Sequence, residues 1–447
     1  MKDIVIEETI SDITSADIPY YTIKSDGTRD RTNTENVSVA LRYVKDGKVH
    51  EELIGMLQTD KCDAESMSVL LLEYLDKVNL KPANILSQCY DGASVMSGKH
   101  GGVQKKLQEK IGKHIPYVHC FSHQLHLVVV HCMEKIDEVR KYFELCAKLY
   151  NFIRRPKVAA IYDGTKIKRL LEQRWTGHLE TTDSIIRNHA KIANVLEDCC
   201  DSGNDVDVSV EATGLLSCIR KKEFLFIALT IKEVLQTMKP ANDLLQDRTC
   251  DLLQGARLVR STAAQLHDMR MDESNRTCDA IERKLREYDL NDDDEMPRKR
   301  KRRIPDYLRD DIVDSTLGHS HTLSPEMERQ RLFKAIIDTV LWEMRDRFSD
   351  TNSDLLSAMS CILPSSEKFL LPDDITQFAE LLKVNTSDTG FRSECEVARK
   401  FILGEIEGKS ISSVPELCEL LLPMTTAFPS VYKLYAGVLA FGASTAV

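Results

Sequence analysis

An alternation of apolar residues, interrupted by a tight turn, is the feature that most restricts the fold of this 447-residue chain. Apolar side chains recur at every second position from residue 37 to residue 43, which is typical of a half-buried strand. The pair Asp46-Gly47 separates this segment from a second β-prone stretch at residues 49–57. Because both turn residues tolerate positive φ, the pattern predicts a β-hairpin.

The hairpin belongs to a longer region of alternating strand and helix signals. The other expected elements are strands at residues 20–25, 83–89 and 115–120, and helices at residues 63–78 and 101–111. Three antiparallel strands followed by βα units indicate an α+β fold with a mixed sheet of RNase H type. The periodicity by itself leaves other α+β folds open.

From about residue 124 onward the chain is expected to be almost entirely helical. One long apolar face runs from Val128 to Ile153, and a later helix begins with Ser324 as its cap and Pro325 at its first position. The expected organisation is an N-terminal extension at residues 1–17, a sheet core at 18–123, a helical insertion at 124–400 with loops at 197–211 and 291–305, and a C-terminal region at 401–447.

Composition excludes several classes of protein. The formal net charge of -10 argues against a generally basic nucleic-acid coat, so any DNA contact requires local basic surface. The 13 scattered cysteines indicate reduced thiols rather than a disulfide framework. We expect a soluble intracellular protein with no membrane partner, since no apolar run is long enough to span a bilayer. The glycine-containing segment at residues 97–102 lacks the phosphate-loop pattern, so no nucleotide cofactor is expected.

Two aspartates stand where strands are expected to end. Asp26 follows the first strand, and Asp91 follows the strand at residues 83–89. Carboxylates on neighbouring strands can share two divalent metals about 4 Å apart, and their oxygens suit Mg²⁺ or Mn²⁺. The alternative is that each Asp-Gly pair is simply a turn, which is the interpretation we take for Asp46-Gly47.

The spacing Cys120-x-x-His123 is compatible with half of a zinc site. A structural zinc site needs four ligands, usually from two such pairs. No second pair follows at a suitable distance, so the sequence does not predict bound zinc.

Three blocks around these residues resemble the catalytic half of a hAT-superfamily transposase. They are residues 25–30, 90–104 and 119–125. The resemblance covers most of the chain, from about residue 18 to residue 447, and is strongest between residues 84 and 150. It is similar in particular to the transposase-like part of zinc finger MYM-type proteins. The resemblance implies that Asp26 and Asp91 are the ancestral catalytic aspartates, with Mg²⁺ or Mn²⁺ if the site is functional. It also implies that Cys120 and His123 position the sheet.

Two further features concern DNA and localisation. The family has an Arg-Trp pair whose Trp stacks on a flipped base, so the resemblance assigns Arg174 and Trp175 to DNA binding. From the residues alone, a lone Trp is more often a core residue or a helix-packing anchor. A basic run has the composition of a nuclear signal or of a solvated loop. It consists of Arg298, Lys299, Arg300, Lys301, Arg302 and Arg303.

The resemblance also implies truncation at both ends. The family's third catalytic Glu follows a stretch of small residues like the one at residues 443–447, and no Glu of this chain can be assigned to it. The expected protein is therefore a transposon-derived, catalytically inactive nuclear scaffold with a partial dimerisation region. Its expected partners are DNA and a second copy or a related hAT-like protein. The alternatives are a fragment of an active Mg²⁺-dependent cut-and-paste transposase and a purely structural interaction module.

Overall fold

The strands predicted in the first part of the chain are present in a computed structural model of the protein. The structure describes residues 2–29, 34–98, 100–170, 175–201, 206–288, 290, 324–348, 353–408, 411 and 413–445. Its strands are β1 (Tyr21–Arg29), β2 (Glu35–Lys45), β3 (Lys48–Thr59), β4 (Ile85–Tyr90) and β5 (Tyr117–His119).

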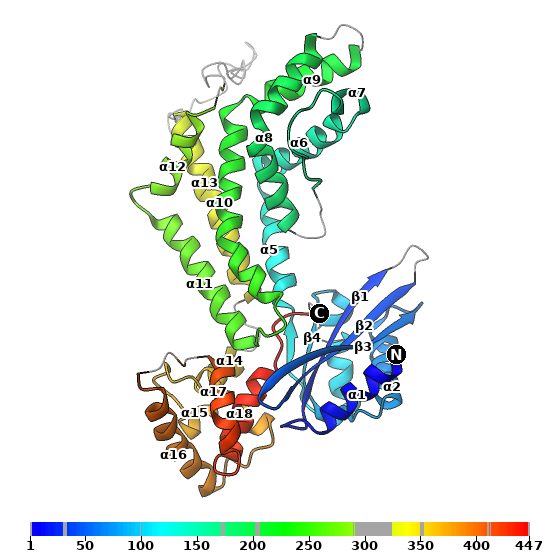
Figure 1. Ribbon diagram of the computed structural model, residues 1–447, viewed down its shortest axis with the longest axis vertical. Coiled ribbons are helices and arrows are strands. Elements are labelled where there is room, and N and C mark those ends of the chain that lie inside the picture. The colour runs from blue at the N-terminus through cyan, green and yellow to red at the C-terminus, as the bar shows by residue number, and fades with distance from the viewer. Residues whose placement is uncertain are drawn as a thin grey trace, which may run out of the picture. The chain divides into compact units, whose positions relative to one another are not determined.

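These strands form one mixed sheet in the order β3-β2-β1-β4-β5. The pairs β1–β2 and β2–β3 are antiparallel, whereas β1–β4 and β4–β5 are parallel (Figure 1). The fold is therefore α+β, with three antiparallel strands followed by βα units, as the sequence predicts.

Local chemistry accounts for the hairpin and for the first long helix. Asp46 and Gly47 both have positive φ, 51° and 70°, so the turn between β2 and β3 is of the kind that Asp-Gly favours. Helix α2 (Ala64–Lys77) begins at the predicted cap, where the Asp63 carboxylate accepts a hydrogen bond of 2.9 Å from the backbone N–H of Ser66.

The chain divides into two compact units. The first, called the sheet unit, comprises Met1–Leu127, Pro240–Thr262 and Met344–Val447, and the second, called the helical unit, comprises Val128–Lys239 and Ala263–Glu343. Helices of the sheet unit alone are α1 (Lys2–Thr14), α2, α3 (Ser94–Ser97), α4 (Val103–Ile111), α14 (Ser353–Ser360), α15 (Pro372–Leu381), α16 (Thr389–Ile406), α17 (Val414–Leu421) and α18 (Pro429–Ala440). Short 3-10 turns occur at Pro82–Asn84 and Leu422–Met424.

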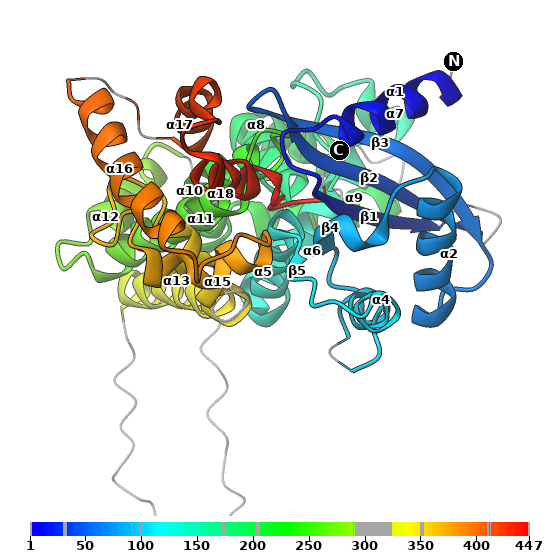
Figure 2. The ribbon, with the colours of Figure 1, turned by 90° about the horizontal axis from the view of Figure 1, so that it is seen from below.

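The sheet has a different covering on each of its two faces. On one face, β-strand residues such as Ile23 and Val39 form a core cluster with Leu71 of α2 and Leu107 of α4. On the other face, α18 contacts β2. There the Thr22 hydroxyl donates a hydrogen bond of 2.7 Å to the carbonyl of Ala440. Figure 2 shows α2 and α4 on one side of the strands and α18 on the other.

The helical unit contains α6 (Asp137–Ile153), α7 (Pro156–Ala159), α8 (Thr176–Asp201), α9 (Val206–Ile219) and α12 (Arg276–Leu285). Four helices contribute residues to both units: α5 (Phe121–Lys135), α10 (Lys222–Leu245), α11 (Leu252–Met271) and α13 (Pro325–Phe348). The cap of α13 is as predicted, because the Ser324 hydroxyl accepts from the N–H of Met327 at 3.2 Å.

Two expectations for the helical region need correction. The apolar face from Val128 to Ile153 is divided between α5 and α6, because Ile136 has extended backbone angles. The acidic first turn of α6 favours a new helix N-terminus there. The loop expected at 197–211 is mostly helical, because buried positions of α8 continue as far as Cys199. The loop expected at 291–305 lies outside the described residues.

No helix in the described parts of the chain has both the length and the apolar character needed to cross a membrane.

Candidate functional site

The sheet places Asp26 and Asp91 side by side, although the 64 residues from 27 to 90 separate them in the chain. Strands β1 and β4 are parallel neighbours, and Ser25 pairs with Tyr90 in their register. Asp26 and Asp91 come directly after this pair. Asp91 follows the end of β4, as expected, whereas Asp26 lies within β1, which continues to Arg29 because it still pairs with β2 there. Because side chains alternate along strands, both aspartates lie on the face of Lys24 and Cys89, two positions further along, which is the face that α18 covers.

The charges at this edge of the sheet influence one another. The pKa of Asp26 is raised, first because the surrounding protein reduces the hydration of its exposed carboxylate, and then because Asp91 adds a second negative charge. The nearby His123 acts in the opposite direction. The Asp91 carboxylate accepts a hydrogen bond of 3.3 Å from the N–H of Ala93, which fixes the turn after β4.

A glycine lets His119 approach this turn closely. A Cβ at Gly92 would lie 2.5 Å from Nε2 of His119, so only glycine fits without a shift. Burial lowers the pKa of His119 to about 4, with smaller contributions from the charges of His123 and Arg347. The imidazole is therefore neutral at physiological pH and stands beside the aspartate pair.

Cys120 fastens the last described segment of the chain to this edge. Its buried Sγ accepts hydrogen bonds from the N–H of Thr445 at 3.2 Å and from the Thr445 hydroxyl at 3.3 Å. The N–H of Phe121 donates to the carbonyl of Ala443 at 2.8 Å. Cys120 and His123 thus have different surroundings: the cysteine packs on the C-terminal segment, and the half-buried histidine lies near Asp26.

The side chains at this edge of the sheet provide only part of a metal site. Two carboxylates on one face suit Mg²⁺ or Mn²⁺ in kind. Across the described residues, however, no group of three or more His, Cys, Asp and Glu is placed to hold a metal ion. Asp26 and Asp91 would supply two of the ligands, and the described chain supplies no third.

A buried cluster of charges on the same face was not predicted from the sequence. Lys24, Arg42 and Glu51 are only 3%, 1% and 4% exposed. Glu51 pairs with the Lys24 ammonium and, at 3.2 Å, with the Arg42 guanidinium. Arg42 also donates to the carbonyls of Leu439 at 2.8 Å and Arg248 at 2.5 Å, so the cluster fastens the end of α18 to the sheet.

The other residues predicted for function lie elsewhere or are not described. Trp175 belongs to the helical unit and is only 2% exposed, so stacking on a base would require it to become accessible. Arg174 lies outside the described residues, and so does the basic run at residues 298–303. The assignments of this Arg-Trp pair to DNA and of the basic run to nuclear import remain predictions.

Comparison with known protein families gives a match in the N-terminal part of the chain. Residues 1–102 match the family model DUF4371, described as "ZMYM1/FAM200, RNase-like domain". The matched segment contains β1 to β4 and both aspartates of the candidate site. The N-terminal part of this chain is therefore similar to the RNase-like domain of the ZMYM1/FAM200 proteins, a similarity that is consistent with a transposase-derived domain.

Proposed function

We propose that this protein is a hAT-transposase-derived scaffold with an RNase H-like sheet, that it binds DNA through local basic surface, and that it is catalytically inactive. The observation that carries the proposal is the adjacency of the two aspartates, with Asp26 within β1 and Asp91 directly after its parallel neighbour β4. The order β3-β2-β1-β4-β5, with an antiparallel half and a parallel half, supports the RNase H-like assignment. The match of residues 1–102 to an RNase-like domain supports it independently.

The proposed inactivity follows from the composition of the site. Two-metal phosphoryl chemistry needs enough carboxylates to hold both ions and to balance their charge. The described residues offer Asp26 and Asp91 without a third ligand of that kind. In addition, the raised pKa of Asp26 makes its carboxylate harder to ionise and so disfavours metal binding at mildly acidic pH.

The second candidate is an active Mg²⁺-dependent transposase whose remaining carboxylate lies beyond residue 447. The intact pair of aspartates favours this candidate over a purely structural module. Sequencing the native transcript past the Val447 codon tests it directly. A reading frame that continues into the family's Glu-containing helix would make the enzyme the leading interpretation.

The scaffold hypothesis is tested by separating DNA binding from catalysis. We expect the full chain to bind a labelled DNA duplex or single strand in fluorescence anisotropy, and to leave supercoiled plasmid uncut in the presence of Mn²⁺. Mn²⁺-dependent strand cleavage that Asp91→Asn abolishes would overturn the proposed inactivity. Failure to bind any DNA at low salt would overturn the proposed binding.

The resemblance to hAT transposases and the basic composition of residues 298–303 lead to two further proposals, on oligomerisation and on localisation. We propose that the protein associates with a second copy or with a related hAT-like protein, which light scattering coupled to size-exclusion chromatography measures. Nuclear import through residues 298–303 is tested by a fluorescent fusion. Replacing the six basic residues with glutamine should move the fusion out of the nucleus.

A further inference from the structure

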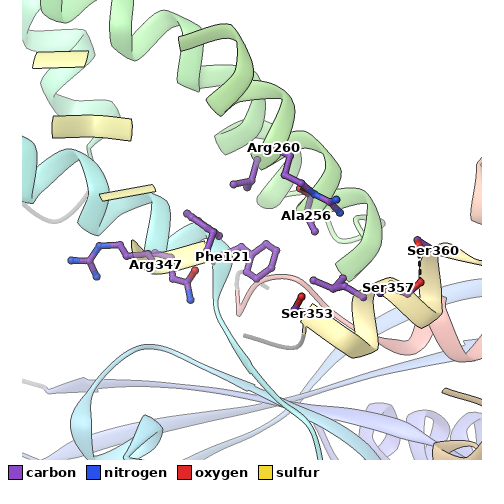
Figure 3. Close-up of a pocket in the computed structure, with 11 residues that line it drawn as sticks. Phe121, Ala256, Arg260, Arg347, Ser353, Ser357 and Ser360 are labelled. Carbon is purple, nitrogen blue, oxygen red and sulfur yellow. Dashed lines mark hydrogen bonds between the residues drawn. The ribbon is translucent and has the colours of Figure 1, made fainter. Parts of the chain in front are cut away.

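A cavity of about 370 Å³ lies within the sheet unit, lined by residues of α5, α11, α13 and α14 (Figure 3). Two arginines, Arg260 and Arg347, and three serines of α14 line it, and the residues described around it include no carboxylate. Phe121 and Phe348 form an apolar part of the wall. Their rings pack edge to face, with the ring centroids 5.3 Å apart. The volume and the mixed lining are those of a small-molecule site.

Gln124 is a polar side chain of this lining that the fold leaves unsatisfied. It is only 1% exposed, and its amide oxygen has no hydrogen-bond partner among the described residues. A buried acceptor without a partner is unfavourable, so a ligand that offers an N–H would be bound here with a gain. An amide also carries a donor beside its acceptor, which matches the hydrogen-bonding edge of a nucleobase.

The positive charge of the cavity extends toward the aspartate edge. Figure 3 shows Arg260 on α11, on one side of Phe121, and Arg347 on the other side with its guanidinium directed outward. The charge of Arg347 contributes to the low pKa of His119, which contacts Gly92 next to Asp91. Arginine is well suited to phosphate because its fork donates two parallel hydrogen bonds.

We propose that this cavity binds one nucleotide unit of a single DNA strand. Its base would lie against the Phe121–Phe348 wall with its edge on Gln124. The phosphates on its two sides would lie one at Arg260 and the other at Arg347. The base must be unpaired to enter, so the site takes a single strand or a flipped nucleotide. The inference rests on the proposed DNA binding, and a free nucleotide offers the same chemistry.

The test uses the full chain and a fluorescein-labelled single-stranded oligonucleotide over a range of salt concentrations. The variant Arg260→Gln/Arg347→Gln should bind at least about ten-fold more weakly. The slope of the logarithm of the binding constant against the logarithm of the salt concentration should become less negative by about 1.4. This is the change expected for the loss of two phosphate contacts on a single strand. The matched control is Arg257→Gln, an exposed arginine of the same helix that does not line the cavity. It should stay within about two-fold of the unmodified chain.

A second variant and a second probe separate the possible failures. Ser353→Asp adds a negative charge at an exposed lining position and should weaken binding without affecting folding, as checked by circular dichroism. If the oligonucleotide binds but neither variant weakens it, the cavity proposal is wrong and the proposed DNA binding stands. If no DNA binds but deoxyadenosine monophosphate gives an arginine-dependent saturation-transfer NMR signal, the cavity is a nucleotide site and the DNA proposal is wrong. Binding of neither probe overturns both.

Discussion

Replacing Glu51 with glutamine should destabilise the sheet unit by about 3–5 kcal/mol, the cost of removing one partner from a buried ion pair. The substitution keeps the size of the side chain but leaves Lys24 and Arg42 as two buried cations, 3% and 1% exposed. Burial already lowers the pKa of Lys24, and Glu51 is the main group that opposes this shift. Without Glu51, the Lys24 ammonium would either lose its proton or remain charged in a buried position, which is unfavourable in free energy.

Removing a cation instead of the anion should be far less costly. Lys24→Met preserves most of the volume and leaves Glu51 paired with Arg42 at 3.2 Å. It also removes the free-energy cost of burying one charge, so we expect the free energy of unfolding to fall by at most about 1 kcal/mol. The matched control is Glu52→Gln, the same chemical change at the adjacent residue, whose side chain points to the opposite face of β3. It should change stability by less than about 0.5 kcal/mol.

Hydrogen exchange read by mass spectrometry is the suitable assay, because it reports the two units separately. Peptides from β1, β2 and α18 should lose protection in Glu51→Gln, since Arg42 connects the sheet to the Leu439 carbonyl. Both tryptophans, Trp175 and Trp342, belong to the helical unit, so their fluorescence serves as an internal reference in urea. An equal cost for Lys24→Met and Glu51→Gln, or a loss below about 1 kcal/mol in the latter, would refute the reasoning.

Three further predictions concern the aspartate edge. Gly92→Ala should lower the free energy of unfolding by about 1–3 kcal/mol in chemical denaturation, because the new Cβ would lie 2.5 Å from Nε2 of His119. Gly101→Ala is the control and should be neutral or slightly stabilising, because its Cβ would have no atom within 4 Å. Equal effects of the two substitutions would contradict this reasoning. The His119 pKa of about 4, against 6.5 in the unfolded chain, means that the unfolded state binds more protons between these values. Stability is thus lost as pH falls through that window, by about 2.5 kcal/mol between about pH 7.5 and pH 4.5, and His119→Gln should lose correspondingly less. Finally, calorimetry should show only weak Mn²⁺ binding, because Asp26 and Asp91 are the two ligands that the described residues offer there. Asp91→Ala should remove this binding, and acidification should weaken it from a higher pH than for an ordinary aspartate, because the pKa of Asp26 is raised. Binding unchanged in Asp91→Ala would place the metal elsewhere.

The sequence was sufficient for features that depend on neighbouring residues. The hairpin at Asp46-Gly47 and the cap at Asp63 follow from local backbone and side-chain chemistry, and the structure confirms both. The expectation that Asp26 and Asp91 act together came from the family resemblance, and the strand order places them on neighbouring strands. The family resemblance added the expectation of an RNase-like domain, which the match of residues 1–102 supports.

Features that depend on distant segments were not predictable in this way. Thr22, Lys24 and Asp26 are polar residues at alternate positions, a pattern typical of a solvent-facing strand. The structure buries Thr22 and Lys24 because α18, about 400 residues later, covers that face. The cavity beside α5 is likewise assembled from four helices whose sequence separation hides their proximity.

The covering of the sheet by α18 has a consequence for synthesis of the protein. During translation, the strands leave the ribosome well before residues 429–440 of α18 are made. Until then the face that carries Lys24, Arg42 and Thr22 lacks this cover, and its polar groups lack the carbonyl partners that α18 supplies. Long-range contacts of this kind slow folding and expose nascent chains to aggregation. Residues 1–102, although they correspond to one family model, are therefore expected to need chaperones when they are produced as a separate fragment.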